Sequence, residues 1–220
     1  MFIGHFGVGF GAKSAARRTS LGTLFLAAQF ADILWPTFVL LGLEWVEVRP
    51  GITRVTPLDF VYYPLSHSLA FGCLWALVFA GIYWLVRRYL AGAIVAGACV
   101  VSHWFLDLVV HRPDLPLAPG SDVKLGLGLW SSLPATLIVE LAVFGAGLAL
   151  YLRATQARDR IGSFGLWGLA IFLLAIFLAS LFGPPPPSAT AVAWSDQGQW
   201  LIVALAYWVD RHRVPRNASP

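Results

Sequence analysis

Long apolar runs dominate the chain, and their length is typical of helices that cross a lipid bilayer. Such a helix needs about 20 consecutive apolar residues. Five clear runs cover about residues 21–43, 66–86, 89–110, 129–152 and 162–182, and a weaker sixth covers about residues 198–209. The segment 2–12 is long enough only for a half-helix that enters the membrane and turns back. We therefore expect an all-α integral membrane protein in which residues 1–220 form a single bundle of about six transmembrane helices.

Composition agrees with this interpretation. Of the 220 residues, 58% are hydrophobic and 12% are charged, which is about half the charged fraction of a soluble domain. Cys73 and Cys99 both lie inside apolar runs, so we expect neither a disulfide framework nor a cysteine-ligated zinc site. The net charge of +4 does not require a nucleic-acid partner, because the basic residues gather at the ends of the runs. Membrane lipids are the expected partners, and the oligomeric state stays open.

The basic residues predict the orientation of the chain, because cytoplasmic loops are rich in Lys and Arg. The segments before, between and after the apolar runs should lie alternately on the two sides of the membrane. Those on the side of the N-terminus contain eleven of the 15 basic residues: Lys13, Arg17, Arg18, Arg87, Arg88, Arg153, Arg158, Arg160, Arg211, Arg213 and Arg216. Those on the other side contain Arg49, Arg54, Arg112 and Lys124. We expect both termini to be cytoplasmic, with a basic tail over residues 211–220. The run Pro184 to Pro187 predicts an extended external connector over residues 184–197.

The candidate chemistry begins with a stripe of ionisable side chains in the third apolar run. His103, Asp107 and His111 are spaced four residues apart, so a helix places all three on one face. Ionisable residues at membrane depth are costly and usually functional. A His and an Asp at this spacing can bind one divalent cation, because imidazole nitrogen and carboxylate oxygen are ordinary zinc ligands. The alternative for the stripe is a set of interhelical hydrogen bonds that holds the bundle together.

Further candidate ligands lie in other segments. Asp32 is an intramembrane carboxylate with no basic residue in its run, and His67 lies at the start of the second run between Ser66 and Ser68, which can orient its ring. His5 can contribute only if the N-terminal half-helix enters the bundle. The Gly-rich sequence around it predicts close helix packing.

Two residues are candidates for catalysis. Glu140 lies in the middle of the fourth run, where its carboxylate can act as a general base or as a further ligand. His111 is the last member of the stripe and is the second candidate.

The order of these residues resembles a known family. An N-terminal His, an Asp shortly before a Pro, a His-Ser-Leu and a His-x-x-x-Asp resemble the bacterial membrane-bound metal-dependent hydrolases of the LexA-regulated inner-membrane type. In this chain they are His5, Asp32, His67-Ser68-Leu69, His103 and Asp107. The resemblance covers about residues 1 to 140, and the ligand order is also similar to that of the zinc phosphoesterases of the phospholipase C and single-strand nuclease type.

The resemblance implies a ligand set. The first metal would take Asp32, His67, His103 and Asp107, and a second would take His5 and share Asp107. No His-x-x-x-Glu occurs, so the third metal of the soluble enzymes is not expected.

The expected function is hydrolysis by water bound to one or two zinc-class ions, with a phosphoester of a lipid or lipid-linked compound as the substrate. The expected location is the bacterial inner membrane, with the site in its outer half. Basic side chains of the outer loops can hold an anionic headgroup: Arg49, Arg54, Arg112 or Lys124. Two alternatives remain open. The same His and Asp residues can serve a transporter or proton relay, or the chain can be a non-catalytic scaffold.

Overall fold

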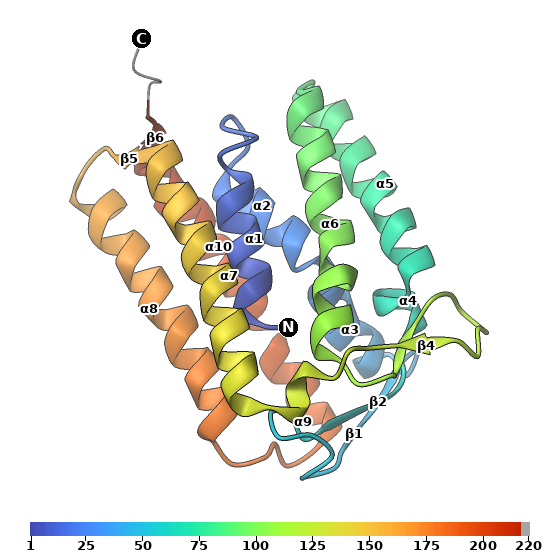
Figure 1. The fold of residues 1–220 in the computed structure, drawn as a ribbon. Helices are drawn as coiled ribbons and strands as arrows, with labels where there is room; N and C mark the ends of the chain where they lie inside the picture. Colours follow the sequence, from blue (N-terminus) through green and yellow to red (C-terminus); the bar gives the residue numbers. More distant parts are fainter. Residues whose placement is uncertain (217–220) are drawn as a thin grey trace.

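The computed structural model describes residues 1–216, and it is mainly helical. The helices are α1 (Ile3–Ala12), α2 (Leu21–Ala28), α3 (Phe30–Leu40), α4 (Pro64–His67), α5 (Leu69–Arg87), α6 (Leu90–Val110), α7 (Leu133–Ala154), α8 (Arg160–Phe182), α9 (Ala189–Asp196) and α10 (Gln199–Arg211), with a short 3-10 turn at Leu129–Ser131. Long helices run side by side through the bundle, and short helices and loops gather at its ends (Figure 1).

Four helices are long and apolar enough to cross a membrane, namely α5, α6, α7 and α8, and the bent pair α2 and α3 makes a fifth candidate. These helices indicate a multi-pass membrane protein. The prediction of about six spans is too high for residues 1–216 by this criterion. Its weak sixth member is α10, which has 13 residues and is too short to cross a bilayer alone.

The first predicted span is broken rather than continuous. α2 and α3 meet at Gln29 at an angle of 57°. Pro36 lies inside α3 and has no N–H to donate to the carbonyl of Asp32, one helical turn earlier. Gln199 replaces the missing donor, because its side-chain amide donates to that carbonyl at 3.1 Å. The bend and the hydrogen bond from Gln199 therefore turn Asp32 toward the interior of the bundle.

The N-terminal segment forms the short helix α1, which packs against α7, α2 and α6. Glycine permits this contact, as the Gly-rich sequence predicts. A Cβ atom on Gly7 would lie 2.6 Å from the carbonyl oxygen of Val143, and one on Gly147 would lie 1.9 Å from the carbonyl oxygen of Gly7. The backbones of α1 and α7 are therefore in direct contact, and His5 is carried into the core.

Three short antiparallel strand pairs add to the predicted all-α fold. They are β1 (Trp45–Val48) with β2 (Leu58–Tyr62), β3 (Leu115–Pro116) with β4 (Lys124–Leu125), and β5 (Thr155–Ala157) with β6 (Arg213–Pro215). The β5–β6 pair joins the α7–α8 turn to the C-terminal segment at one end of the bundle, whereas β1, β2, β4 and α9 lie at the other end (Figure 1).

The predicted end segments differ in detail. The extended connector expected over residues 184–197 is shorter, because Ala189–Asp196 form α9. The expected basic tail over residues 211–220 begins at the end of α10 and continues into β6, and residues 217–220 of it lie outside the described residues.

Candidate metal centre

Five buried or partly buried ionisable side chains converge inside the apolar bundle. They are His5 from α1, Asp32 from α3, His67 from α4, and His103 and Asp107 from α6. The three imidazoles are at most 5% exposed, and Asp107 is 2% exposed. Placing so many ionisable groups in an apolar interior is costly unless they are paired or bind a metal.

Four His–Asp pairs in this cluster have the spacing of ligands around one ion. The Oδ1 of Asp32 lies 3.2 Å from the Nε2 of His67 and 3.5 Å from the Nε2 of His103. The Oδ2 of Asp107 lies 3.1 Å from His103 and 3.7 Å from His67. Four ligands at about 2.0–2.1 Å from a tetrahedral zinc lie about 3.3 Å from one another. Asp32, His67 and His103 can therefore hold one such ion, and Asp107 lies close to both of these histidines.

His5 extends the cluster on its other side. Its Nε2 lies 3.0 Å from the Oδ1 of Asp107, and its ring stacks on His103 with the ring centres 3.7 Å apart. The amino nitrogen of Met1 also contacts this carboxylate oxygen. The two oxygens of Asp107 thus face different histidines. His5, His103 and Asp107 form a second group that can hold a metal ion.

The bend between α2 and α3 fixes the orientation of the His103 ring. The Nδ1 of His103 lies 2.8 Å from the carbonyl oxygen of Ala28, the last residue of α2, and must donate to it. Its Nε2 is then left as the atom with a free lone pair. Among the described residues this buried Nε2 has no hydrogen-bond partner, which is the state expected of a nitrogen that binds a metal.

A relay of hydrogen bonds orients His67 in the same way. The Oγ of Ser66 donates to Glu44 at 2.6 Å and accepts from the Nδ1 of His67 at 2.7 Å, so the Nε2 of His67 points at the cluster with its lone pair. The backbone N–H of Ser66 also donates to Glu44. Burial raises the pKa of the Glu44 carboxyl above its ordinary value, and the donors from Ser66 oppose that shift. Ser68 instead caps the N-terminus of α5.

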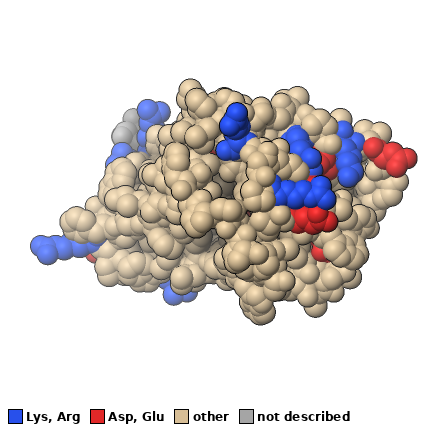
Figure 2. Space-filling model, turned by 90° about the horizontal axis from the view of Figure 1, so that it is seen from below, with Lys and Arg blue, Asp and Glu red and all other residues tan. Residues whose placement is uncertain are grey.

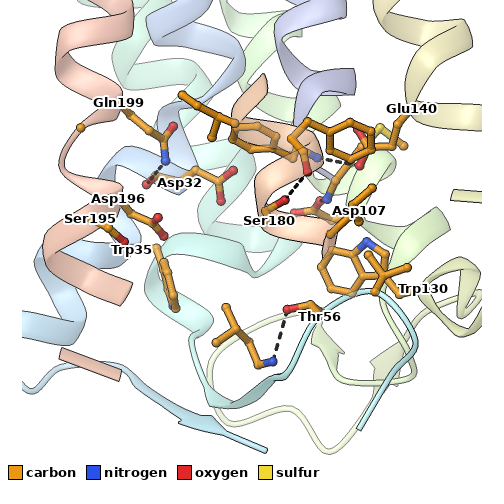
Figure 3. A pocket seen from close by; sticks show the side chains of 18 of the residues that line it. Asp32, Trp35, Thr56, Asp107, Trp130, Glu140, Ser180, Ser195, Asp196 and Gln199 are labelled. Atoms are coloured by element: carbon orange, nitrogen blue, oxygen red, sulfur yellow. Dashed lines mark hydrogen bonds and ion pairs between the residues drawn. The ribbon is translucent and has the colours of Figure 1, made fainter. Parts of the chain in front are cut away.

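The cluster forms part of the wall of a cavity of about 340 Å³. Asp32, His67 and Asp107 provide polar groups, whereas α8 and α10 contribute apolar ones such as Ile176 and Ile202. In Figure 3, Asp32 and Asp196 lie on one side of the cavity, Asp107 and Glu140 lie on the other, and the β1–β2 loop passes beneath with Thr56. The cavity is therefore polar at the cluster and apolar beyond it.

Glu140 lies beside the cluster, in contact with α1. Its two carboxylate oxygens accept from the backbone N–H groups of Phe2 and Gly4, each at 2.8 Å. Phe2 is the residue before α1 and Gly4 lies in its first turn, where backbone N–H groups have no partner within the helix. Glu140 therefore ties α7 to the start of α1, two residues before His5. Its proposed catalytic role stays a prediction.

His111 lies apart from the two candidate ligand groups. Its Nδ1 donates to Asp114 at 2.9 Å, and the hydroxyl of Tyr63 donates to the same carboxylate oxygen at 3.1 Å. The ring lies against Trp130, with ring centres 4.4 Å apart, and lines the cavity. His111 therefore faces the cavity without belonging to the cluster, and its catalytic role also stays a prediction.

The four basic residues predicted for the outer loops fall into two classes. Arg49 and Arg112 are both paired with Asp59, and Arg112 is also paired with Asp114. Arg54 and Lys124 have no carboxylate within ion-pair distance among residues 1–216.

Figure 2 views this end of the molecule and shows basic side chains beside a hollow in its surface. Arg54 lines a hollow that shares Val55, Thr56, Ser180 and Leu181 with the cavity.

Comparisons with known proteins give no match, whether with protein-family models, with curated proteins or with solved structures.

Proposed function

We propose that this protein is a membrane-bound metal-dependent hydrolase of the family that its sequence resembles. The observation that carries the proposal lies beside the cavity: one carboxylate oxygen of Asp32 and one of Asp107 each lie 3.1–3.7 Å from the Nε2 atoms of both His67 and His103. Two of the histidines donate from Nδ1 to an oxygen atom, which in the neutral imidazole leaves the lone pair on Nε2. Such oriented imidazoles are typical of metal sites.

Several residues of this chain have separate roles in the proposed reaction. When bound, an ion of the zinc class acidifies water and polarises an ester. His5 shares Asp107 with the principal set and provides for a second ion. Glu140 holds the start of α1 in place, and with it His5. His111 faces the cavity with Nδ1 held by Asp114, which leaves its Nε2 to exchange a proton with the substrate.

The cavity favours an amphiphilic substrate. Its polar side suits a phosphoester, and its apolar walls suit hydrocarbon. Arg54 borders the adjoining hollow without a carboxylate partner among residues 1–216, so it is the outer basic residue that we assign to an anionic headgroup. We place the protein in the bacterial inner membrane with both termini in the cytoplasm and the cavity in the outer half.

The interior argues against a proton or ion path through the whole bundle. Between His5 and Lys13, α1 presents Phe6 and Phe10, which are fully buried. Their rings pack against Phe25, and Phe10 also packs against Tyr151. This aromatic layer separates the cluster from the end of the bundle that carries Lys13, so a hydrolase fits the structure better than a relay.

Hydrolysis can be tested directly with a simple lipid phosphoester. We expect purified protein with added Zn²⁺ or Mn²⁺ to release phosphate from phosphatidic acid in detergent micelles. Asp107→Asn should reduce this rate to background, because the Asp107 carboxylate lies within 3.7 Å of the Nε2 atoms of His5, His67 and His103. His212→Ala is the matched control, since His212 pairs with Asp159 in the loop region before α8 and should keep its activity. Equal phosphate release by the wild type and by Asp107→Asn would refute the assignment.

A further inference from the structure

Two exposed apolar residues, one on α8 and one on α10, also line the cavity. Phe172 on α8 and Leu201 on α10 both line it, yet Phe172 is 41% exposed and Leu201 is 59% exposed. Their exposed faces lie on helices whose other outward residues are also apolar, including Ile171 and Trp200. The cavity wall is therefore continuous with an apolar outer surface.

α8 and α10 lie close together at one end and form a wedge-shaped gap toward the other. Near β5 and β6 they touch closely, because a Cβ atom on Gly162 would lie 1.9 Å from the carbonyl oxygen of His212. A Cβ atom on Gly165 would likewise lie 3.4 Å from the ring of Trp208. Toward the opposite end both helices line the cavity, α8 through Phe172, Ile176, Phe177, Ser180 and Leu181, and α10 through Gln199, Leu201 and Ile202. The helices therefore diverge toward the end that carries α9.

The opening of this wedge lies at the depth of lipid chains. α8 is one of the helices long enough to span a membrane. At a rise of about 1.5 Å per residue, Phe172 is about 18 Å from the start of α8 at Arg160. The cavity-lining part of α8 thus runs from the middle of the span to its end. The β1–β2 loop, with Val55 and Thr56, lines the cavity on the water-facing side.

We propose that the gap between α8 and α10 is a lateral entrance through which a hydrocarbon chain of the substrate lipid reaches from the bilayer, with its phosphate at the metal centre. This proposal deepens the proposed hydrolase function and rests on it. At about 340 Å³ the cavity is at the small end of ligand sites. It holds a headgroup and the start of a chain, so the rest of the chain must leave the protein sideways.

A photocrosslinking experiment tests the entrance without requiring turnover. The full-length protein is reconstituted into phosphatidylcholine vesicles that contain phosphatidic acid with a diazirine in its acyl chain. Crosslinked peptides are then located by mass spectrometry. We expect residues 172–181 and 199–202 to be labelled several-fold more strongly by this probe than by a phosphatidylcholine probe with the same diazirine. Leu201→Trp should remove most of this excess by filling the opening, whereas Ile171→Trp, exposed but not lining the cavity, should retain it.

The outcomes separate this proposal from the hydrolase assignment. The entrance is refuted if both probes label these segments no more than the exposed α5 face at Leu77 and Val86, or if Leu201→Trp leaves the labelling unchanged. Excess labelling without phosphate release would support a lipid entrance and count against hydrolysis. Phosphate release without excess labelling would support hydrolysis and overturn the entrance.

Discussion

Ser66 and Ser68 lie on either side of His67, and only Ser66 hydrogen-bonds to its ring. Ser66 links the imidazole to Glu44, whereas the Oγ of Ser68 accepts from the backbone N–H of Phe71. The sequence predicts that these serines can orient His67, and the structure assigns that contact to Ser66 alone. At the residue scale, Ser66 should therefore affect metal binding, whereas Ser68 should affect the stability of α5.

We expect Ser66→Ala to weaken metal binding by about 10- to 100-fold, because loss of a hydrogen bond to a ligating histidine typically has this effect. Ser68→Ala should leave metal affinity unchanged and lower stability by about 1 kcal/mol through loss of an N-cap. Competition with a chelator and thermal unfolding in detergent measure the two effects. Equal metal affinity in both variants would show that Ser66 does not position His67.

Residue patterns predicted the members of the cluster, but they did not predict all of the residues that orient them. The four-residue spacing and the apolar context of His103 and Asp107 are visible in the sequence, and the structure brings Asp32, His67 and His5 to them. Glu44 could not be found this way, because it lies in a loop and acts only through Ser66.

At the element scale, α1 and its contact with α7 decide where His5 lies. The sequence predicted a half-helix with close packing, and the glycine contacts bear out the packing. It did not predict the bend at Gln29. The proline inside the run was visible, but the donor that compensates for it comes from Gln199, 167 residues away in the sequence. Side-chain amides that satisfy a distant carbonyl leave no local pattern.

We expect Gly147→Ala to push α1 away from α7, because the new methyl group would meet the backbone of Gly7 at 1.9 Å. His5 would then move from Asp107, and any second metal should bind more weakly or be lost. Gly11→Ala is the matched control, since its methyl group would make an ordinary contact of 3.4 Å with Leu150. Metal stoichiometry and thermal stability check this prediction. Identical behaviour of the two variants would contradict the packing role of Gly147.

The whole molecule has two chemically different ends. One carries the α5–α6 turn, the β5–β6 pair and the buried ion pair between Lys13 and Asp210. The other carries α9 and the β1–β2 hairpin, whose loop lines the cavity with Val55 and Thr56. Helix number was hard to predict from the sequence. The weak sixth run is apolar, but its helix has only 13 residues and packs beside α2 and α8 instead of crossing as a single long span.

Membrane orientation can be tested with single cysteines in a chain whose Cys73 and Cys99 are replaced by Ser. We expect Lys124→Cys to react with a membrane-impermeant maleimide in intact bacterial spheroplasts. Arg88→Cys should react only after permeabilisation, since the basic end is expected to face the cytoplasm. The reverse pattern would place the cavity in the inner half of the membrane.

The central claim is that the buried His and Asp cluster binds metal. The most direct measurement is elemental mass spectrometry of the purified wild type, His103→Ala and His212→Ala, with folding checked by size exclusion and circular dichroism. We predict one to two zinc-class ions per chain in the wild type and in His212→Ala, and a clear loss in folded His103→Ala. A wild type that stays free of metal after reconstitution with excess Zn²⁺ and Mn²⁺ would contradict the account.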